Sequence, residues 1–321
     1  MRAVPDCTPP VWTTRPYNHA TDHHQLTQIC ADVYGGQDYL PYSAEAISVA
    51  SENTMIVAEN SDGALGCIGN LRQLSKTVHF IEAIRTASSH RRQGLATQMV
   101  GQLLLEAEKH QSAAVLSASI TANVAMQAAF GRVNMQAITE FHLMDSSSLA
   151  HFDQHSNLSM AAELQVEQYL LQQPGCDRMA ESFRPVTSKG EFESALQHLG
   201  TCRSQNVQDV YALRYYSAAP VEHLQSATDA GHVYISCSNT GAAPDALVVF
   251  HSDPLISSLN SQLVCSLSAQ TPEGLQAGFL FASRMKHRWF LVLDTALSDC
   301  EFCKMLPLSS NTAVIYEKLM Q

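Results

Sequence analysis

Two adjacent arginines followed by a glycine could hold a bound anion. They lie in the stretch Arg91-Arg92-Gln93-Gly94-Leu95-Ala96. The stretch is preceded by an apolar, β-branched segment (78–86) and followed by a segment with apolar residues at helical spacing (94–110). A glycine lets the backbone bend closely around a ligand, and the N–H groups at a helix start point outward. The sequence therefore predicts strand, loop and helix, with a site suited to pyrophosphate between them. The plainer alternative is an ordinary turn with exposed arginines.

The composition is that of a globular protein, and 321 residues are enough for two domains of ordinary size. The net charge of −11 argues against broad nucleic-acid binding and against attraction to anionic lipid. No apolar run approaches the roughly 18 to 20 residues of a membrane span, and residues 1–10 lack the apolar centre of a secretion signal. We therefore expect a cytoplasmic protein without a nucleic-acid or membrane partner. The sequence does not specify the oligomeric state.

The nine cysteines are scattered through the chain and odd in number. Without a secretion signal they are expected to be reduced thiols, mostly in the core. Cys300 and Cys303 form a single CxxC pair, whereas a structural zinc site would need a second pair nearby. We therefore predict no metal site.

Hydrophobic periodicity predicts alternating strands and helices in the first half of the chain. The expected order is strand 11–15, helix 22–33, helix 44–51, hairpin strands 54–59 and 64–74, strand 78–86, helix 94–110, strand 113–119, helix 123–132 and strand 135–144. A serine-rich stretch, 145–149, then indicates a boundary. We predict domains at 11–145 and 182–321, joined by a linker and connecting helix at 146–181.

The second half repeats the first in outline, with a strand at 263–269, a polar loop and a helix at 279–285. Its loop has Thr271 and Pro272 where the first half has two arginines, and Gln262 stands where the first half has Glu82. Glu273 would place a negative charge where pyrophosphate should bind. This half therefore looks like a degenerate copy that has lost the anion site.

The loop and its flanking elements resemble the acetyl-CoA signature of the GCN5-related N-acetyltransferase (GNAT) superfamily. That signature is Arg or Gln, two residues, Gly, one residue, and Gly or Ala, and it is matched by Arg91, Gly94 and Ala96. The resemblance implies an α/β (α+β) fold in which a mixed central sheet is flanked by helices. It also implies acetyl-CoA as co-substrate, with its pantetheine arm lying where the strands before and after the signature splay apart.

The same resemblance implies which residues contact acetyl-CoA. Backbone N–H groups near two of them, Ile84 and Thr86, would pair with pantetheine and the acetyl carbonyl oxygen. The full set is Ile84, Arg85, Thr86, Arg91, Arg92, Gln93, Gly94, Leu95, Ala96 and Asn123. Asn123 either contacts pantetheine or caps the helix that follows it.

Glu82 is the candidate general base, because acetyl transfer requires that a protonated amine first lose a proton. Several superfamily members use a glutamate at this strand position, and the base acts directly or through one water. The alternative is a glutamate that faces solvent or forms a salt bridge. Phe130 stands where many members have a tyrosine that protonates the leaving thiolate. That role is therefore unfilled or taken by Tyr34, Tyr39 or Tyr42.

A narrower resemblance points to the histidine N-acetyltransferase-like subgroup. It rests on the segment Tyr34-Gly35-Gly36-Gln37-Asp38-Tyr39-Leu40-Pro41 and on the strand Glu82-Ala83-Ile84-Arg85. It implies that Tyr34, Asp38 and Tyr39 line the acceptor pocket, with Asp38 recognising an ammonium or imidazolium group. The alternative is a structural turn built on the two glycines. Two departures are Phe130 and the loop 87–90, where the subgroup has a proline.

These features together predict an acetyl-CoA-dependent N-acetyltransferase that acts on a small amino acid, with free histidine as the first candidate. One alternative is acetylation of a protein amine or transfer of a longer acyl group. A CoA-binding pseudoenzyme or scaffold is another, since Phe130 and the degenerate second half would suit a chain without turnover.

Overall fold

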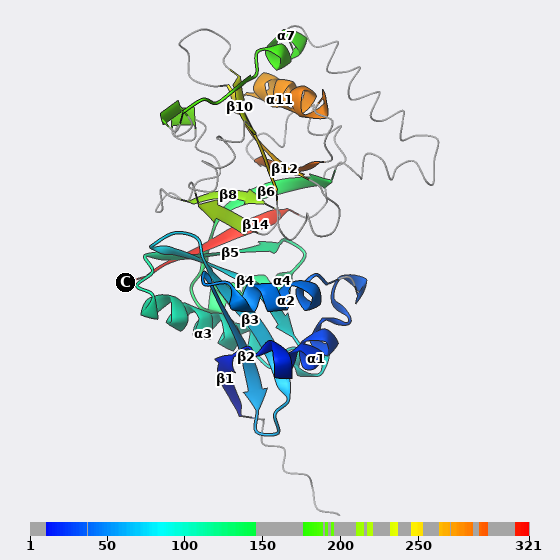
Figure 1. Ribbon diagram of the computed structural model, residues 1–321, viewed down its shortest axis with the longest axis vertical. Coiled ribbons are helices and arrows are strands. Elements are labelled where there is room, and N and C mark those ends of the chain that lie inside the picture. The colour runs from blue at the N-terminus through cyan, green and yellow to red at the C-terminus, as the bar shows by residue number, and fades with distance from the viewer. Residues whose placement is uncertain are drawn as a thin grey trace, which may run out of the picture. The chain divides into compact units, whose positions relative to one another are not determined.

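The computed structural model describes residues 11–36, 38–145, 176–188, 190–191, 194–195, 210–214, 217–220, 232–236, 245–252, 263–269, 271–284, 289–294 and 312–320 (Figure 1). The chain divides into two compact units. The first comprises 1–117, 124–136 and 317–321, and the second comprises 118–123 and 137–316. Three predicted features lie outside the described residues: residues 146–175 of the linker and connecting helix, Gln262, and the Cys300–Cys303 pair.

The first unit contains the mixed sheet and flanking helices that the sequence predicts. Strands β1, β2, β3 and β4 pair antiparallel in that order, and β4 pairs in parallel with β5. The strands are β1 (Trp12–Pro16), β2 (Asn53–Asn60), β3 (Leu65–Gln73), β4 (Val78–Thr86) and β5 (Ala114–Ile120). The helices are α1 (His19–Cys30), α2 (Leu40–Val49), α3 (Leu95–Lys109) and α4 (Val124–Arg132), with short 3₁₀ turns at Val33–Gly36 and Ser88–His90.

Two glycines of β3 allow α3 to lie close to the sheet. A Cβ atom added at Gly66 would come within 2.9 Å of Leu95, and one added at Gly69 within 2.9 Å of Met99 and Leu103. Those three helix residues are buried at one face of α3, as their i, i+4 spacing predicts. The close packing fixes where the start of α3 lies relative to the end of β4.

Helices α1 and α2 cover the sheet with a separate apolar cluster. Its buried members are Tyr17, Leu26, Ile29, Cys30, Leu40, Ala44, Met55, Val57, Leu65, Ile68 and Ala83. Helix α2 begins at Leu40 rather than at residue 44, because Pro41 suits the first turn of a helix. The cluster therefore anchors both ends of the segment that joins α1 to α2.

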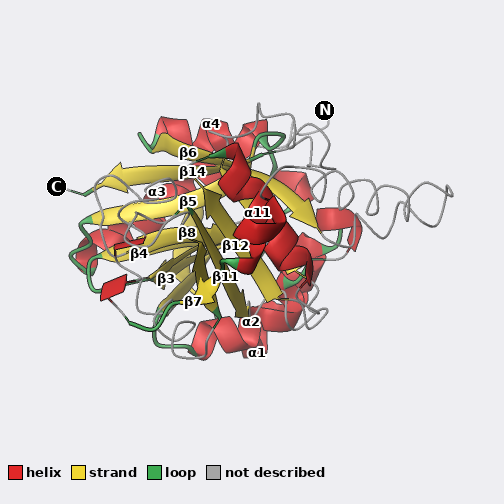
Figure 2. Ribbon diagram, turned by 90° about the horizontal axis from the view of Figure 1, so that it is seen from above, coloured by secondary structure: helices red, strands yellow, loops and turns green. Residues whose placement is uncertain are grey.

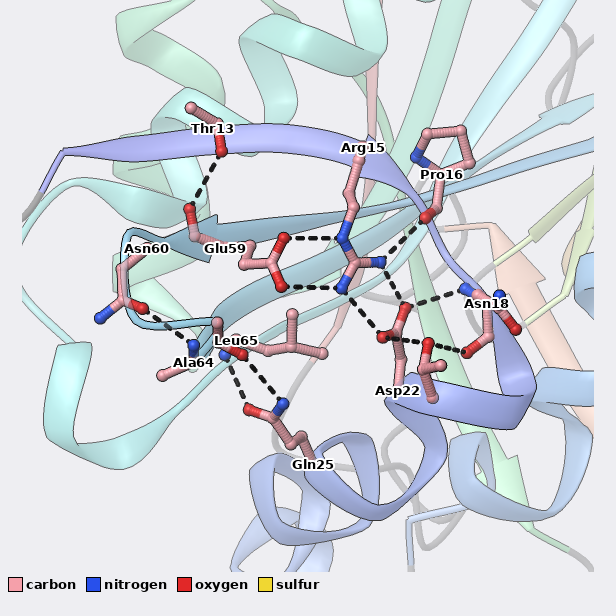
Figure 3. Close-up of polar contacts among 12 residues, drawn as sticks. Thr13, Arg15, Pro16, Asn18, Asp22, Gln25, Glu59, Asn60, Ala64 and Leu65 are labelled. Atoms are coloured by element: carbon pink, nitrogen blue, oxygen red, sulfur yellow. Dashed lines mark hydrogen bonds and ion pairs between the residues drawn. The ribbon is translucent and has the colours of Figure 1, made fainter.

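Arg15 holds the start of α1 to the first two strands (Figure 3). Its guanidinium donates to both carboxylate oxygens of Asp22 on α1, at 2.6 and 2.9 Å, and to those of Glu59 on β2, at 2.7 and 3.0 Å. Burial raises the pKa of Asp22, but the Arg15 hydrogen bonds outweigh it and the pKa is lowered overall. Asn18 caps the helix by accepting from the N–H of Ala20 at 3.0 Å. This charged cluster therefore has a structural role.

His79 is a buried histidine at the beginning of β4. Its Nδ1 lies 2.6 Å from the Ser112 Oγ, and its ring stacks on that of His110 with 5.4 Å between centroids. Burial, followed by the charge of His110, lowers the pKa of His79 to about 4. The unfolded chain keeps the ordinary value near 6.5. Because the unfolded chain binds this proton more readily, acidification favours unfolding.

We therefore expect His79 to make the first unit sensitive to acid. When the pH is lowered from 7 to 5, the free energy of unfolding should fall by about 1 to 2 kcal/mol more in the parent than in a His79→Gln variant. Glutamine keeps a hydrogen-bonding group for Ser112 but does not titrate. Urea unfolding of both proteins at the two pH values measures the difference. Equal losses in parent and variant would show that His79 does not carry the effect.

The second unit repeats the succession of antiparallel and then parallel strand pairs seen in the first, and its helix α11 lies against β11 and β12 (Figure 2). Strands β10, β11 and β12 pair antiparallel, β12 and β13 pair in parallel with α11 between them in sequence, and β13 pairs antiparallel with β6. The elements are β6 (Gln136–Asp145), α7 (Cys176–Glu181), β7 (Arg184–Pro185), β8 (Val210–Arg214), β9 (Ser217–Pro220), β10 (Val233–Ser236), β11 (Ala246–Ser252), β12 (Leu263–Ala269), α11 (Pro272–Arg284), β13 (Trp289–Asp294) and β14 (Ala313–Leu319).

The C-terminal end of β14 belongs to the first unit. There the N–H of Met320 donates to the carbonyl of Ala113 at 2.9 Å, and Lys318 Nζ donates to the carbonyl of Val133 at 2.8 Å. The other end of β14 belongs to the second unit, where the N–H of Thr121 donates to the carbonyl of Thr312. Among the helices that the structure describes, none has the length and apolar character required to cross a membrane.

Candidate active site

The predicted anion loop forms a tight turn into α3. Arg92 and Gly94 both have left-handed backbone conformations, with φ of 64° and 83°. Gly94 is the N-cap, and no side chain caps the helix within the described residues. The first hydrogen bond of the helix runs from the N–H of Gln98 to the carbonyl of Gly94. Among the described residues, no side chain therefore occupies the N–H groups of the first turn, as the predicted anion site requires.

The side chains of the loop are mostly exposed. Arg91 Nη2 donates to Asp32 Oδ1 at 2.7 Å, and Arg91 Nε donates to the carbonyl of Thr86 at 3.3 Å. Gln93 Nε2 donates to the carbonyl of Ser89 at 3.2 Å, while Leu95 is buried against the sheet. The loop thus presents positive charge to solvent at the start of α3.

The parallel pairing of β4 and β5 ends before either strand does. Their parallel pairing runs from Val78 to Ile81 on β4, although β4 continues to Thr86 and β5 to Ile120. Just past the last pair, Ala83 has a φ of 58°, and the register between β3 and β4 shifts. A left-handed alanine in a strand is uncommon, and bulges of this kind cluster at functional sites. The backbone of 84–86 is redirected there, next to the anion loop.

Glu82 lies immediately before this bulge and is held by two residues of β3. It accepts from Asn70 Nδ2 at 3.1 Å and from Arg72 Nε and Nη2 at 3.2 Å each. Its side chain is 13% exposed, so it is accessible only in part. Asn70 Nδ2 also donates to Asn53 Oδ1 on β2 at 2.7 Å. The salt bridge considered for Glu82 is therefore present.

Asp38 and Arg85 form a buried ion pair between the α1–α2 segment and β4. Arg85 Nε and Nη2 donate to the two Asp38 carboxylate oxygens at 2.6 and 3.0 Å. The Asp38 side chain is 1% exposed and the Arg85 side chain is 11% exposed. Burial raises the pKa of Asp38, but hydrogen bonds and charge from Arg85 outweigh it and the pKa is lowered overall. The charge of Asp38 is thus already compensated within the protein. This pair fixes the segment to the strand that carries Glu82.

Two tyrosines of the same segment, Tyr34 and Tyr39, flank Asp38 in the sequence. The Arg85 guanidinium lies 5.4 Å from the ring centroid of Tyr34 and 5.6 Å from that of Tyr39. Tyr34 is 58% exposed and has a left-handed backbone with a φ of 49°. Burial raises the pKa of Tyr39, and the charge of Glu82 adds to the increase. The structure thus brings Tyr34, Asp38 and Tyr39 together around Arg85.

The remaining predicted residues lie on or next to α4. Asn123 directly precedes that helix and donates its backbone N–H to the carbonyl of Ile120 at 2.9 Å. Phe130 is 1% exposed in the core. Among the described residues, no group of three or more His, Cys, Asp or Glu side chains is placed to hold a metal ion.

Residues 17–134 match the model of the acetyltransferase (GNAT) family. This segment is a GNAT acetyltransferase domain. A GCN5-related N-acetyltransferase from Sphaerobacter thermophilus is 9% identical with a TM-score of 0.55, covering 96% of this chain and 95% of its own. The glucosamine N-acetyltransferase region of a fungal multi-domain β-N-acetylglucosaminidase is 12% identical with a TM-score of 0.55, covering 98% and 39%. At such low identity these structures show the fold alone. No curated protein matches the sequence.

The GNAT domain contains site residues that the sequence did not reveal. Asn70 and Arg72 contact Glu82, Asn53 accepts from Asn70, and Asp32 pairs with Arg91. Asn70 and Arg72 are two residues apart, so a strand places both on one face. This spacing was the only indication of the pair in the sequence. Their partner could not be identified without the register between β3 and β4.

Proposed function

We propose that the chain is an acetyl-CoA-dependent N-acetyltransferase that transfers an acetyl group to the amine of a small amino acid, with free histidine as the first candidate. The supporting observation is that Glu82 directly follows the last β4 residue that pairs with β5, on the strand that also carries Arg85, the partner of Asp38 and of the Tyr34 ring. A thioester, an amine and a base could meet at such a position.

The chain's own groups suit each part of acetyl-CoA. The first N–H groups of α3, together with Arg91 and Arg92, would bind the phosphates. The redirected backbone of 84–86 would pair with the pantetheine arm and polarise the acetyl carbonyl. Glu82 would take a proton from the ammonium group, directly or through one water. The neutral nitrogen then bonds to the acetyl carbon while the carbon–sulfur bond breaks. The nitrogen loses its second proton to give the amide, and the leaving CoA thiolate takes up that proton, directly or through water.

The acceptor would lie near the segment from Tyr34 to Tyr39. Asp38 alone is a weak candidate for binding an ammonium group, because Arg85 already compensates its charge. The exposed ring of Tyr34 is better placed to receive a small cationic or aromatic acceptor. We retain Asp38 as the residue that positions this segment.

The second half would bind no CoA. Its corresponding helix, α11, is capped by the Thr271 Oγ, which accepts from the N–H of Gly274 at 3.1 Å. Pro272 has no N–H, and Glu273 brings negative charge to the first turn. Each feature removes part of what α3 offers to a phosphate, so we infer a degenerate copy without a cofactor site.

Calorimetry with acetyl-CoA tests where the cofactor binds. We expect one acetyl-CoA per chain, and Arg91→Glu should weaken binding about tenfold or more, because a repulsive carboxylate replaces a phosphate-binding cation. Glu273→Lys is the matched control on the second half and should leave affinity unchanged. Two molecules per chain, or an equal loss in both variants, would contradict the assignment.

A thiol-release assay with a panel of free amino acids, amines and peptides tests the reaction and the acceptor. Turnover with free histidine or another small amino acid supports the proposal. Turnover only with peptides would favour a protein acetyltransferase. The buried Phe130, which cannot donate a proton, favours one further candidate, a CoA-binding protein without turnover. Acetyl-CoA binding without thiol release from any acceptor would identify that function.

A further inference from the structure

Asp32 is an acidic residue in an unfavourable position for a negative charge. It follows Ala31, the C-cap of α1, and the last turn of this helix contains no basic residue. The C-terminal end of a helix carries a partial negative charge, so an aspartate there is destabilising unless a cation lies nearby. The cation that the structure supplies is Arg91, whose Nη2 lies 2.7 Å from Asp32 Oδ1.

Arg91 belongs to the anion loop rather than to α1. It lies beside the left-handed Arg92 and close to the uncapped start of α3. Its Nε–H bond to the Thr86 carbonyl leaves the guanidinium directed at Asp32. Both members of the pair are about half exposed, at 46% and 49%. A carboxylate of the protein therefore occupies a donor that a phosphate of the ligand would otherwise use.

We propose that Asp32 is an affinity-determining residue of the cofactor site: an internal counterion that competes with the phosphates of acetyl-CoA for Arg91. The inference rests on the proposed acetyl-CoA site. Binding of the phosphates requires Arg91 to exchange the Asp32 carboxylate for a phosphate oxygen, which lowers the net gain from that arginine. Because Asp32 adjoins the turn that carries Tyr34, the exchange also releases a tie between the cofactor loop and the acceptor segment.

Asp32→Asn should tighten acetyl-CoA binding about two- to fivefold at low salt, a range set by the small contribution of exposed ion pairs. The gain should shrink as salt screens the charges. Asp62→Asn, in the exposed turn between β2 and β3, makes the same change in net charge and is the matched control. It should alter affinity by less than the Asp32 variant does. Isothermal titration calorimetry on the full chain measures all three proteins.

A second ligand distinguishes competition between Asp32 and the phosphates for Arg91 from a general change in the site. S-acetylpantetheine lacks the phosphates, so its inhibition constant against acetyl-CoA should be the same in parent and Asp32→Asn. Equal tightening of both ligands, or no tightening of acetyl-CoA, would overturn the inference. If Arg91→Glu weakens acetyl-CoA binding while Asp32→Asn does not tighten it, only the inference fails. If Arg91→Glu has no effect, the proposed cofactor site fails as well.

Discussion

Replacing Glu82 with glutamine is expected to lower turnover about a hundred- to ten-thousand-fold, the range that a positioned general base contributes. Glutamine keeps the shape of the side chain and can still accept from Asn70, but it cannot take a proton from an ammonium group. Affinity for acetyl-CoA should change little, because the contacts proposed for the phosphates and the pantetheine arm do not involve the Glu82 side chain. Steady-state kinetics between pH 6 and 9, with calorimetry for binding, separates the two effects.

The control must account for the ion pair that the substitution also breaks. Glu59 on β2 accepts from Arg15 in a comparable two-bond pair and lies outside the proposed site (Figure 3). Glu59→Gln should therefore retain turnover within a few-fold of the parent. If Glu82→Gln turns over within about threefold of the parent across this pH range, far less than a base contributes, then Glu82 is structural. A water chain or a tyrosine of the acceptor segment would then be the better candidate.

Removing the Asp38 carboxylate should have the largest effect on stability. Asp38→Ala leaves the Arg85 guanidinium, which is 11% exposed, without its partner, and such a loss costs about 3 to 5 kcal/mol. Asp32→Ala is the matched control in the same segment. It breaks the exposed pair with Arg91 and should cost no more than about 1 kcal/mol. Urea unfolding of the variants and the parent gives the two values.

A double substitution keeps this prediction testable if Asp38→Ala does not fold. Asp38→Leu combined with Arg85→Met replaces the pair by apolar side chains and should regain much of the lost stability, because no buried charge is left uncompensated. The double variant should still have a raised Michaelis constant for the acceptor, since the Tyr34–Tyr39 segment loses its attachment. Equal costs for the Asp38 and Asp32 variants would show that burial of the pair is unimportant.

The sequence alone was sufficient for the local elements of the first unit. The strand at 78–86 and the helix beginning after Gly94 were predicted within a residue, because alternation, helical spacing and a glycine at the turn are short-range signals. The GNAT fold of this part was implied by the resemblance of the Arg91–Ala96 loop to the acetyl-CoA signature, and it is confirmed by the family match. That the loop binds an anion stays a prediction, based on its two arginines and the helix start.

The partners of the charged residues were decided by the tertiary structure. Asp38 was expected to meet a substrate cation, yet it pairs with Arg85, 47 residues further along the chain. The register shift at the bulge likewise sets which β3 residues face Glu82. Tertiary contacts also decide that the N–H of Met320 donates to the carbonyl of Ala113 in the first unit. Sequence spacing shows which residue types are available on an element. Register and the path of connecting segments determine which charges meet, because they depend on contacts between residues far apart in the chain.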